Sequence, residues 1–340
     1  MVLDGQSSQT IALAAQALQR GDLIGLPTET VYGLAANASD AQAVAKIFNI
    51  KGRPSDHPLI VHVTDIESAK RFASDIPDFA KRLIYAFWPG PLTLILPRIK
   101  DVATDAAGGQ NSVGIRCPSH PLARQILLAA QGVGVWGLAA PSANKFGRVS
   151  PTTAAHVLKE LGDALLIVDG GPCDVGIESA IVDCTRGHPV LLRPGVLTIE
   201  QLSLACGEKV LQQGEQLSPT SSAPKASGTL AAHYAPVAKL FLMDMQEIEQ
   251  KLVQRTNNAP LAIWSKAALK AQSQEPLCGK LGMHWQQMPS DPAHCAHMLF
   301  AQLRAFDALG VEQIWVEAPP LDSAWQGVHD RLRRAETVGR

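Results

Sequence analysis

The stretch KGRPSDHPLIVHV, residues 51–63, joins a loop that carries two cations to an apolar strand. Lys51 and Arg53 flank a glycine that allows close backbone approach, and Pro54 keeps Arg53 out of the helical region. Beyond residue 58, the period of two in a strand places Ile60 and His62 on one face, opposite Leu59, Val61 and Val63. A cationic loop before a buried strand often holds small anions, although a solvated loop before an ordinary core strand gives the same pattern.

The composition is that of a globular protein with room for two domains: 340 residues, 46% of them hydrophobic and 18% charged. The net charge of −1 weighs against nucleic-acid binding, which usually requires a basic excess. The cysteines lack CxxC spacing, so neither a disulfide framework nor a zinc site is indicated. Because no apolar run reaches the ~18 residues of a membrane span and the first residues do not resemble a signal peptide, we expect a cytoplasmic protein without membrane association.

The first part of the chain, residues 1–206, mixes strands and helices without a regular alternation. We predict strands at residues 22–27, 59–63, 92–97, 112–117, 134–140, 165–169, 179–184 and 190–192. We predict helices at residues 6–20, 39–49, 65–74, 77–88 and 119–131, and others that begin at residues 150 and 198. In the helix at residue 150, Ser150 would be the N-cap and Pro151 the first helical residue, so its free N–H groups could face an anion. This pattern predicts a mixed, twisted α/β sheet.

The rest of the chain divides into a linker and a regular domain. Residues 207–233 are rich in Ser, Pro and Gly, as linkers are. In residues 234–340, strands at 239–243, 260–265, 283–288 and 313–318 alternate with helices at 246–256, 266–272, 291–309 and 323–334. This alternation predicts a smaller, parallel, Rossmann-like α/β domain. The GxGxxG motif is absent, so dinucleotide binding is not supported.

The polar residues of the first domain gather where predicted strands begin or end, which is where open α/β sheets bind ligands. They are Thr28, Thr30, Lys51, Arg53, His57, Arg116, Ser142, Asn144 and Arg193. Converging guanidinium groups would suit phosphates and a carboxylate, although a single arginine is more often a surface residue. Glu178 either binds magnesium together with substrate phosphates or is a solvated loop carboxylate. His294 and His297 are expected on a helix surface, because the spacing places no third metal ligand.

Eight segments, in order, resemble the threonylcarbamoyl-AMP synthase family, which is the YrdC-domain family in its longer form with a second C-terminal domain. The segments are PTETVYGLAA (27–36), KGRPSDHPLIVHV (51–63), FWPGPLTLIL (87–96), SVGIRCPSHP (112–121), AAPSANKFGRVSPT (139–152), GIESAIVD (176–183), LRPG (192–195) and HYAP (233–236). The resemblance implies a YrdC-like first domain, residues 1–206, a linker, residues 207–233, and a second domain, residues 234–340.

The resemblance also implies an activity: L-threonine, bicarbonate and ATP give threonylcarbamoyl-adenylate and pyrophosphate, for the N6-threonylcarbamoyladenosine modification of tRNA. The family's tetrad falls on Lys51, Arg53, Ser142 and Asn144. Threonine would contact Thr30, His62, Arg116, the backbone of Ala140, and Ser179. ATP would contact Arg53, His57, Ser112, Ser142, Ser150, Arg193 and Tyr234. Mg²⁺ would accompany ATP without a tightly bound prosthetic group, and the product would pass to the tRNA threonylcarbamoyl transferase machinery with little or no direct tRNA binding.

Two positions depart from the commonest family pattern. Ala180 replaces a threonine, a change that should leave Ser179 in place, and Ser227-Gly228 stands where Pro-Gly is usual. The second change bears on how firmly the linker is held; we hypothesise that residues 207–233 fold across the cleft as a lid. One alternative function is an RNA-binding or ribosome-associated module, against which the neutral charge counts. Another is the carbamoyl-adenylate chemistry of hydrogenase maturation, but the zinc-finger-like and acylphosphatase-like segments of those proteins are not visible.

Overall fold

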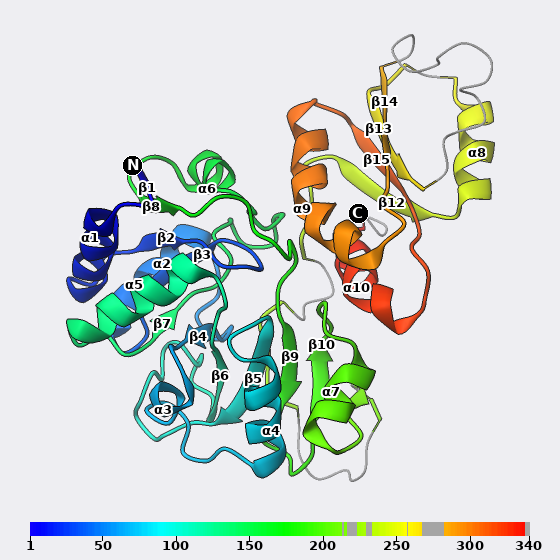
Figure 1. The fold of residues 1–340 in the computed structure, drawn as a ribbon. Coiled ribbons are helices and arrows are strands. Elements are labelled where there is room, and N and C mark those ends of the chain that lie inside the picture. Colours follow the sequence, from blue (N-terminus) through cyan, green and yellow to red (C-terminus); the bar gives the residue numbers. More distant parts are fainter. Residues whose placement is uncertain (213, 216–222, 229–232, 257, 267–281, 337–340) are drawn as a thin grey trace. The chain divides into compact units, whose positions relative to one another are not determined.

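The computed structural model describes residues 1–212, 214–215, 223–228, 233–256, 258–266 and 282–336. The chain forms two compact units. The first consists of Met1–Phe146 and Ser150–Thr229, and the second of Gly147–Val149 and Leu230–Arg340. The predicted fold class is confirmed, since a large mixed sheet lies in the first unit and a parallel sheet in the second (Figure 1).

The first unit is built on an eleven-stranded sheet within the described residues. Its strands are β1 (Val2–Asp4), β2 (Ile24–Leu26), β3 (Gly33–Asn37), β4 (Ile60–His62), β5 (Leu92–Pro97), β6 (Ser112–Arg116), β7 (Leu138–Ala139), β8 (Leu166–Asp169), β9 (Ala180–Asp183), β10 (Val190–Arg193) and β11 (Leu211–Gln212). Its helices are α1 (Ser8–Gln19), α2 (Ala41–Lys51), α3 (Ile66–Ala69), α4 (Asp78–Phe87), α5 (Pro121–Gly132), α6 (Ala154–Leu161) and α7 (Ile199–Cys206).

The strand order is β1-β8-β2-β3-β7-β4-β6-β5-β9-β10-β11, which does not follow the order in the chain. The sheet is mixed: it contains parallel pairs such as β4 with β6 and antiparallel pairs such as β5 with β6. Figure 1 shows α1 beside α5 on one part of the sheet, where Leu18 and Ile126 contribute to a common apolar cluster. The order brings β4, β6, β5 and β9 together as neighbours, and these strands carry the site described below.

The alternation predicted for residues 59–63 is confirmed on its apolar face. Leu59, Val61 and Val63 are at most 1% exposed and belong to the main core cluster. Ile60 is half-buried and lies on the opposite face with His62, which is also buried. The strand therefore places its aliphatic side chains in the core and leaves the His62 face for the site.

Two helix predictions are wrong at their ends. The helix expected at residues 65–74 is only α3, because Ala73 forms a bridge with Arg98 and its neighbours bond to the same segment instead of continuing the helix. Ser150 is not an N-cap: α6 begins at Ala154, and the side chain of Thr153 accepts a hydrogen bond from the N–H of His156. The carbonyl groups of residues 151 and 152 accept from Tyr32 and Cys173 and so hold this segment outside the helix.

Three strands were not predicted, namely β1, β3 and β11, and β7 is shorter than the predicted strand. β11 lies in the segment expected to be a linker and pairs with β10 in parallel. It has only two paired residues, so it lacks the run of alternating residues by which a strand is recognised in sequence. The boundaries at residues 206 and 233, and the lid role, stay predictions.

The second unit has a four-stranded sheet of order β12-β15-β13-β14, and all its strand pairs are parallel. Its elements are β12 (Lys239–Met243), α8 (Met245–Gln254), β13 (Leu261–Ser265), β14 (Met283–Gln287), α9 (Pro292–Ala308), β15 (Gln313–Glu317), the 3₁₀ turn Ser323–Trp325 and α10 (Gln326–Ala335). Each predicted strand matches to within one residue. The helix predicted at 266–272 lies outside the described residues, apart from residue 266.

Candidate active site

A row of polar side chains crosses three neighbouring strands of the first unit. His62 on β4 is paired in register with Arg116 on β6, and Arg116 with Thr93 on β5. Residues paired side by side in a sheet share a face, so the three side chains point to the same side. None of them is more than 4% exposed. The strand pairing therefore places an imidazole, a guanidinium and a hydroxyl next to one another.

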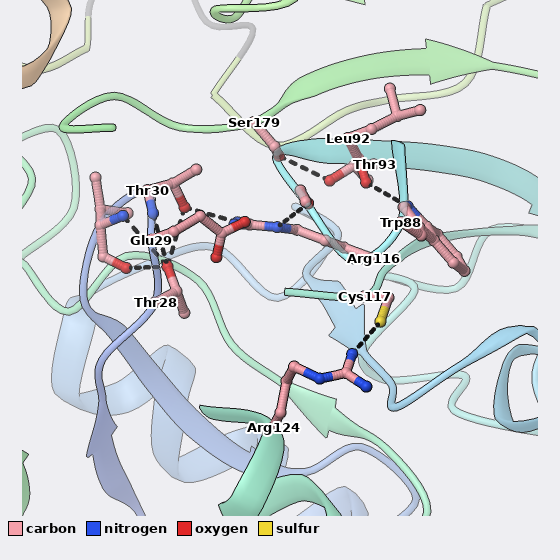
Figure 2. Close-up of polar contacts among 12 residues, drawn as sticks. Thr28, Glu29, Thr30, Trp88, Leu92, Thr93, Arg116, Cys117, Arg124 and Ser179 are labelled. Carbon is pink, nitrogen blue, oxygen red and sulfur yellow. Dashed lines mark hydrogen bonds and ion pairs between the residues drawn. The ribbon is translucent and has the colours of Figure 1, made fainter. Parts of the chain in front are cut away.

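Arg116 is held by contacts on three sides (Figure 2). Its Nη2 lies 2.6 Å from Oε1 of Glu29, its Nη1 donates to Oγ1 of Thr30 at 2.7 Å, and its Nε donates to the carbonyl of Gly90 at 3.3 Å. Both side chains of the ion pair are 5% exposed. Burial acts to raise the pKa of Glu29, but the charge of Arg116 and the hydrogen bonds to the carboxylate outweigh it, and the pKa is lowered. Glu29 is therefore ionised at neutral pH and keeps Arg116 in one orientation.

His62 is a neutral ring at physiological pH. Burial, with the nearby charge of Arg116, lowers its pKa to about 3. Its Nδ1 lies 3.3 Å from the carbonyl oxygen of Ile60. Next to a permanently charged guanidinium, His62 can offer a hydrogen-bond donor or acceptor but no second positive charge.

Ser179 lies just before β9 and connects the row to Arg193. Its Oγ is 2.8 Å from Oγ1 of Thr93 (Figure 2). Arg193 donates to the Ser179 carbonyl from both Nε and Nη2, at 3.0 and 2.9 Å, and from Nη2 to its Oγ at 3.3 Å. These contacts join one residue predicted to bind threonine, Ser179, to one predicted to bind ATP, Arg193.

Lys51, the last residue of α2, contacts the loop after β7. Its Nζ donates to the carbonyl oxygens of Ser142 and Asn144, at 2.6 and 2.5 Å. Burial and the neighbouring charge of Arg53 lower the pKa of Lys51 well below its ordinary value. Lys51 thus contacts two members of the predicted tetrad, Ser142 and Asn144, through their backbone carbonyl groups. The side chain of Asn144 donates instead to the carbonyl of Lys145.

Arg53 lies between the loop before β4 and residue 227. Its Nη2 donates to the carbonyl of Pro58 at 2.9 Å and to Oγ of Ser227 at 3.4 Å. Its guanidinium carbon is 5.7 Å from the ring centre of Phe146, and the rings of Phe146 and His57 are in an edge-to-face arrangement with centres 5.5 Å apart. Burial and the charge of Arg53 lower the pKa of His57, which favours the neutral ring.

A small pocket, about 10 Å³ in volume, lies over the same face of β4, β5 and β6. Its lining includes Pro58, Ile60, Thr93, Ser112, Gly114, Ile181 and Ser227. Lys225 at its rim forms an ion pair with Asp56 at 2.6 Å, and its backbone N–H donates to Oε1 of Gln110 at 2.8 Å. The Ser227 carbonyl accepts from Nη1 of Arg193 at 2.9 Å. These contacts hold residues 225–227, themselves part of the first unit, beside the pocket.

The remaining predicted residues lie as follows. The backbone N–H of Ala140 donates to Ile60 at 3.0 Å, beside the row. Ser150 is fully buried, and its hydroxyl donates to Oε1 of Glu178 at 2.5 Å. Tyr234 belongs to the second unit, where it is 1% exposed and packs on Phe300 with ring centres 5.3 Å apart.

No group of three or more His, Cys, Asp or Glu side chains suited to a metal ion occurs among the described residues. His294 is exposed on α9, as predicted, whereas His297 is half-buried, and Cys295 between them is buried. Within the described residues, no helix has the length and apolar character needed to cross a membrane.

Two residues of this arrangement, Glu29 and Thr93, were missed as site residues by the sequence reasoning. Glu29 lies between two threonines, three residues beyond the end of β2, and a carboxylate near a strand end was a usable signal. Thr93 is the one polar residue within the apolar strand LTLILP, and it has no exposed surface. A buried polar residue inside an apolar strand needs a hydrogen-bond partner, but which residue is that partner depends on the order of the strands in the sheet.

Comparisons with known proteins cover both units. Residues 16–195 match the family described as "Telomere recombination", and residues 197–336 match "Threonylcarbamoyl-AMP synthase, C-terminal domain". The chain is 38% identical to the threonylcarbamoyl-AMP synthase of Bacillus subtilis (96% of this chain and 92% of that protein) and 36% identical to that of Pyrococcus abyssi (96% and 93%). The crystal structure of P. abyssi Sua5 complexed with L-threonine superimposes with a TM-score of 0.87 at 32% identity and covers 98% of this chain and 97% of that one.

Proposed function

Because the chain belongs to the threonylcarbamoyl-AMP synthase family, we propose that it is a nucleotidyltransferase that makes L-threonylcarbamoyladenylate. Its substrates are L-threonine, bicarbonate and ATP, and pyrophosphate is the second product. The observation that carries the proposal is the row of His62, Arg116 and Thr93, which shares one sheet face with the pocket over β4, β5 and β6. The P. abyssi relative was solved as a complex with L-threonine, which supports an amino-acid site in the same fold.

Threonine binds at Arg116 in this proposal. A guanidinium pairs with a carboxylate through two N–H groups, and the contacts of Arg116 with described residues engage three of its five. Neutral His62, the backbone of Ala140 and the hydroxyls of Thr30 and Ser179 then fix the rest of the amino acid. Because His62 adds no charge, the net charge at this point is set by Arg116 and Glu29.

ATP binds over the pocket and along the cations beside it. Ser112 lines the pocket, and Arg53 and Arg193 both contact Ser227 at its edge. Guanidinium groups suit the triphosphate. The remaining proposed ATP contacts are His57, Ser142, Ser150 and Tyr234.

The reaction is mainly a matter of positioning and charge. The α-amino nitrogen of threonine first attacks the carbon of bicarbonate, and water leaves to give the carbamate. A carbamate oxygen then attacks the α-phosphorus of ATP, and the bond from that phosphorus to the bridging oxygen of pyrophosphate breaks. Arg53, Lys51 and Arg193 offset the negative charge that develops on the phosphate oxygens. Magnesium usually takes one or two protein carboxylates together with substrate phosphates, and Glu178, whose Oε1 accepts from Ser150, fits that donor requirement. Bound there with ATP, the ion would supply further charge neutralisation.

The product serves the tRNA threonylcarbamoyl transferase machinery, so the protein acts in the cytoplasm with little direct tRNA binding. In this proposal residues 207–233 act as a lid over ATP, which is supported by the position of Lys225 and Ser227 in the lining of the pocket. Limited proteolysis checks this: ATP plus threonine should protect the segment from cleavage. Equal cleavage with and without the two substrates would contradict the lid.

Mass spectrometry of the product formed from ATP, bicarbonate and threonine tests the function. We expect threonylcarbamoyl-adenylate from the wild-type protein and none from Arg53→Ala or Arg116→Ala. Arg71→Ala is the matched control, because Arg71 is an exposed arginine stacked 3.5 Å from the ring centre of Trp136, and it should keep full activity. Full activity in either site variant would show that the cleft is wrongly assigned.

A further inference from the structure

Three hydrogen bonds form a chain through two buried hydroxyl groups beside Arg116 (Figure 2). Oγ1 of Thr28 lies 2.6 Å from the carbonyl oxygen of Val31 and 3.0 Å from Oγ1 of Thr30. Oγ1 of Thr30 in turn accepts a hydrogen bond from Nη1 of Arg116 at 2.7 Å. Thr28 is 2% exposed and Thr30 has no exposed surface, so water does not compete for these bonds.

The direction of each bond in this chain follows from counting protons. Oγ1 of Thr28 also lies 3.3 Å from the backbone N–H groups of Thr30 and Val31, which can only donate to it. A carbonyl oxygen can only accept, so the single hydroxyl proton of Thr28 is used on the carbonyl of Val31. The bond between the two hydroxyls must then use the proton of Thr30. Arginine can only donate, so its bond to Thr30 uses a lone pair of the threonine oxygen. Thr30 is left with one lone pair and no proton for any further partner.

A group that can only accept cannot bind a carboxylate, which is also only an acceptor. Thr30 therefore requires a donor from the substrate. In an α-amino acid the amino group is one carbon away from the carboxylate, and Oγ1 of Thr30 is 2.7 Å from the guanidinium to which we assign that carboxylate.

We propose that Thr28 is a positioning residue that fixes the polarity of Thr30, so that Oγ1 of Thr30 accepts a hydrogen bond from the α-amino group of threonine. The inference rests on the proposed function for the identity of the amino acid. Thr28 does not touch the substrate; it acts by taking the proton of Thr30. The α-amino nitrogen of the substrate threonine is then oriented by the hydrogen bond that it donates to Oγ1 of Thr30, while its lone pair points away from Thr30.

Isothermal titration of L-threonine without ATP tests the proposal. Thr28→Val keeps the shape and removes the hydroxyl, and we expect it to weaken threonine binding about tenfold, the usual effect of losing one well-placed hydrogen bond. Thr28→Ser keeps the hydroxyl and should bind within about threefold of the wild type. Because Thr28 acts through Thr30, Thr28→Val combined with Thr30→Val should bind no more weakly than Thr30→Val alone. The KM for ATP should stay within twofold in Thr28→Val.

Thr64→Val is the control for the loss of a buried hydroxyl, since Thr64 bonds to Ser68 and Gln131 rather than to the site. It should bind threonine like the wild type. Three results would each overturn the proposal. The first is wild-type affinity for threonine in Thr28→Val, and the second is an equal loss of affinity in Thr28→Val and Thr28→Ser. The third is a loss of affinity in the double variant that equals the product of the two single losses. If Thr28→Val does not fold, Thr28→Ala takes its place in the experiment. Wild-type affinity for threonine in Thr30→Val alone would also overturn the proposal. Threonine binding without adenylate formation would contradict the proposed function only.

Discussion

Replacing Glu29 by glutamine should destabilise the first unit by about 3–5 kcal/mol, the usual cost of breaking a buried ion pair from one side. The substitution keeps the shape of the side chain and removes its charge. Arg116 stays charged, is 4% exposed and loses the carboxylate 2.6 Å from its Nη2. For a unit of this size, about 2–4 °C is lost per kcal/mol, so the midpoint of thermal unfolding should fall by roughly 6–20 °C.

The structure offers a matched control in the exposed pair of Glu67 and Lys70. Its N–O distance is also 2.6 Å, but its side chains are 73% and 54% exposed, against 5% for each partner of the buried pair. Glu67→Gln should therefore cost less than about 1 kcal/mol. Differential scanning calorimetry of both variants at pH 7 isolates burial as the variable. Equal unfolding midpoints for the two variants, or a Glu29→Gln midpoint like that of the wild type, would refute the reasoning.

The pH dependence of this difference has a defined sign. The folded-state pKa of Glu29 is lowered from its ordinary value of 4.5, so the carboxylate stabilises the fold at every pH above that value. The contribution is lost as the pH falls through the folded-state pKa. The gap between wild type and Glu29→Gln should therefore be constant from about pH 8 to 5.5 and should narrow below about pH 4.5.

Three further predictions follow from single residues. Because the pKa of His62 is about 3, its Hε1 NMR signal should not move between pH 8 and 5, and a titration near pH 6.5 would contradict the neutral ring. Gly114 lines the pocket, and a Cβ added to it would lie 3.5 Å from the nearest atom, which is an ordinary contact. Gly114→Ala should therefore fold normally but raise the KM for ATP. An unchanged KM would exclude ATP from that pocket. A Cβ added to Gly137 would lie 2.5 Å from the Phe72 ring. Gly137→Ala should therefore lower the free energy of unfolding, measured by denaturant titration, by about 1–3 kcal/mol. A Cβ added to Gly132 meets nothing within 4 Å, so Gly132→Ala is the control and should not destabilise the protein.

Patterns along the chain were sufficient for the strand positions of the second unit and for single strands of the first. The strands of the second unit were predicted to within a residue because predicted strands and predicted helices alternate along this part of the sequence, and parallel pairing follows from that alternation. Period-two alternation also placed Leu59, Val61 and Val63 in the core. These are short-range features, since each depends on a residue and its near neighbours in the sequence.

Only the tertiary structure decided which polar side chains meet. Glu29 and Arg116 are far apart in the sequence, and their ion pair depends on the position of the segment after β2 relative to β6. The same holds for Thr93 and Ser179, which meet because β5 pairs with β9. Residues 51–63 by themselves supplied a cationic loop and a strand with His62 on its second face, whereas the neighbour of that histidine, Arg116, was set by the pairing of β4 with β6. Strand order is a long-range property of the whole sheet, so local periodicity determines the elements and the packing of those elements determines the site.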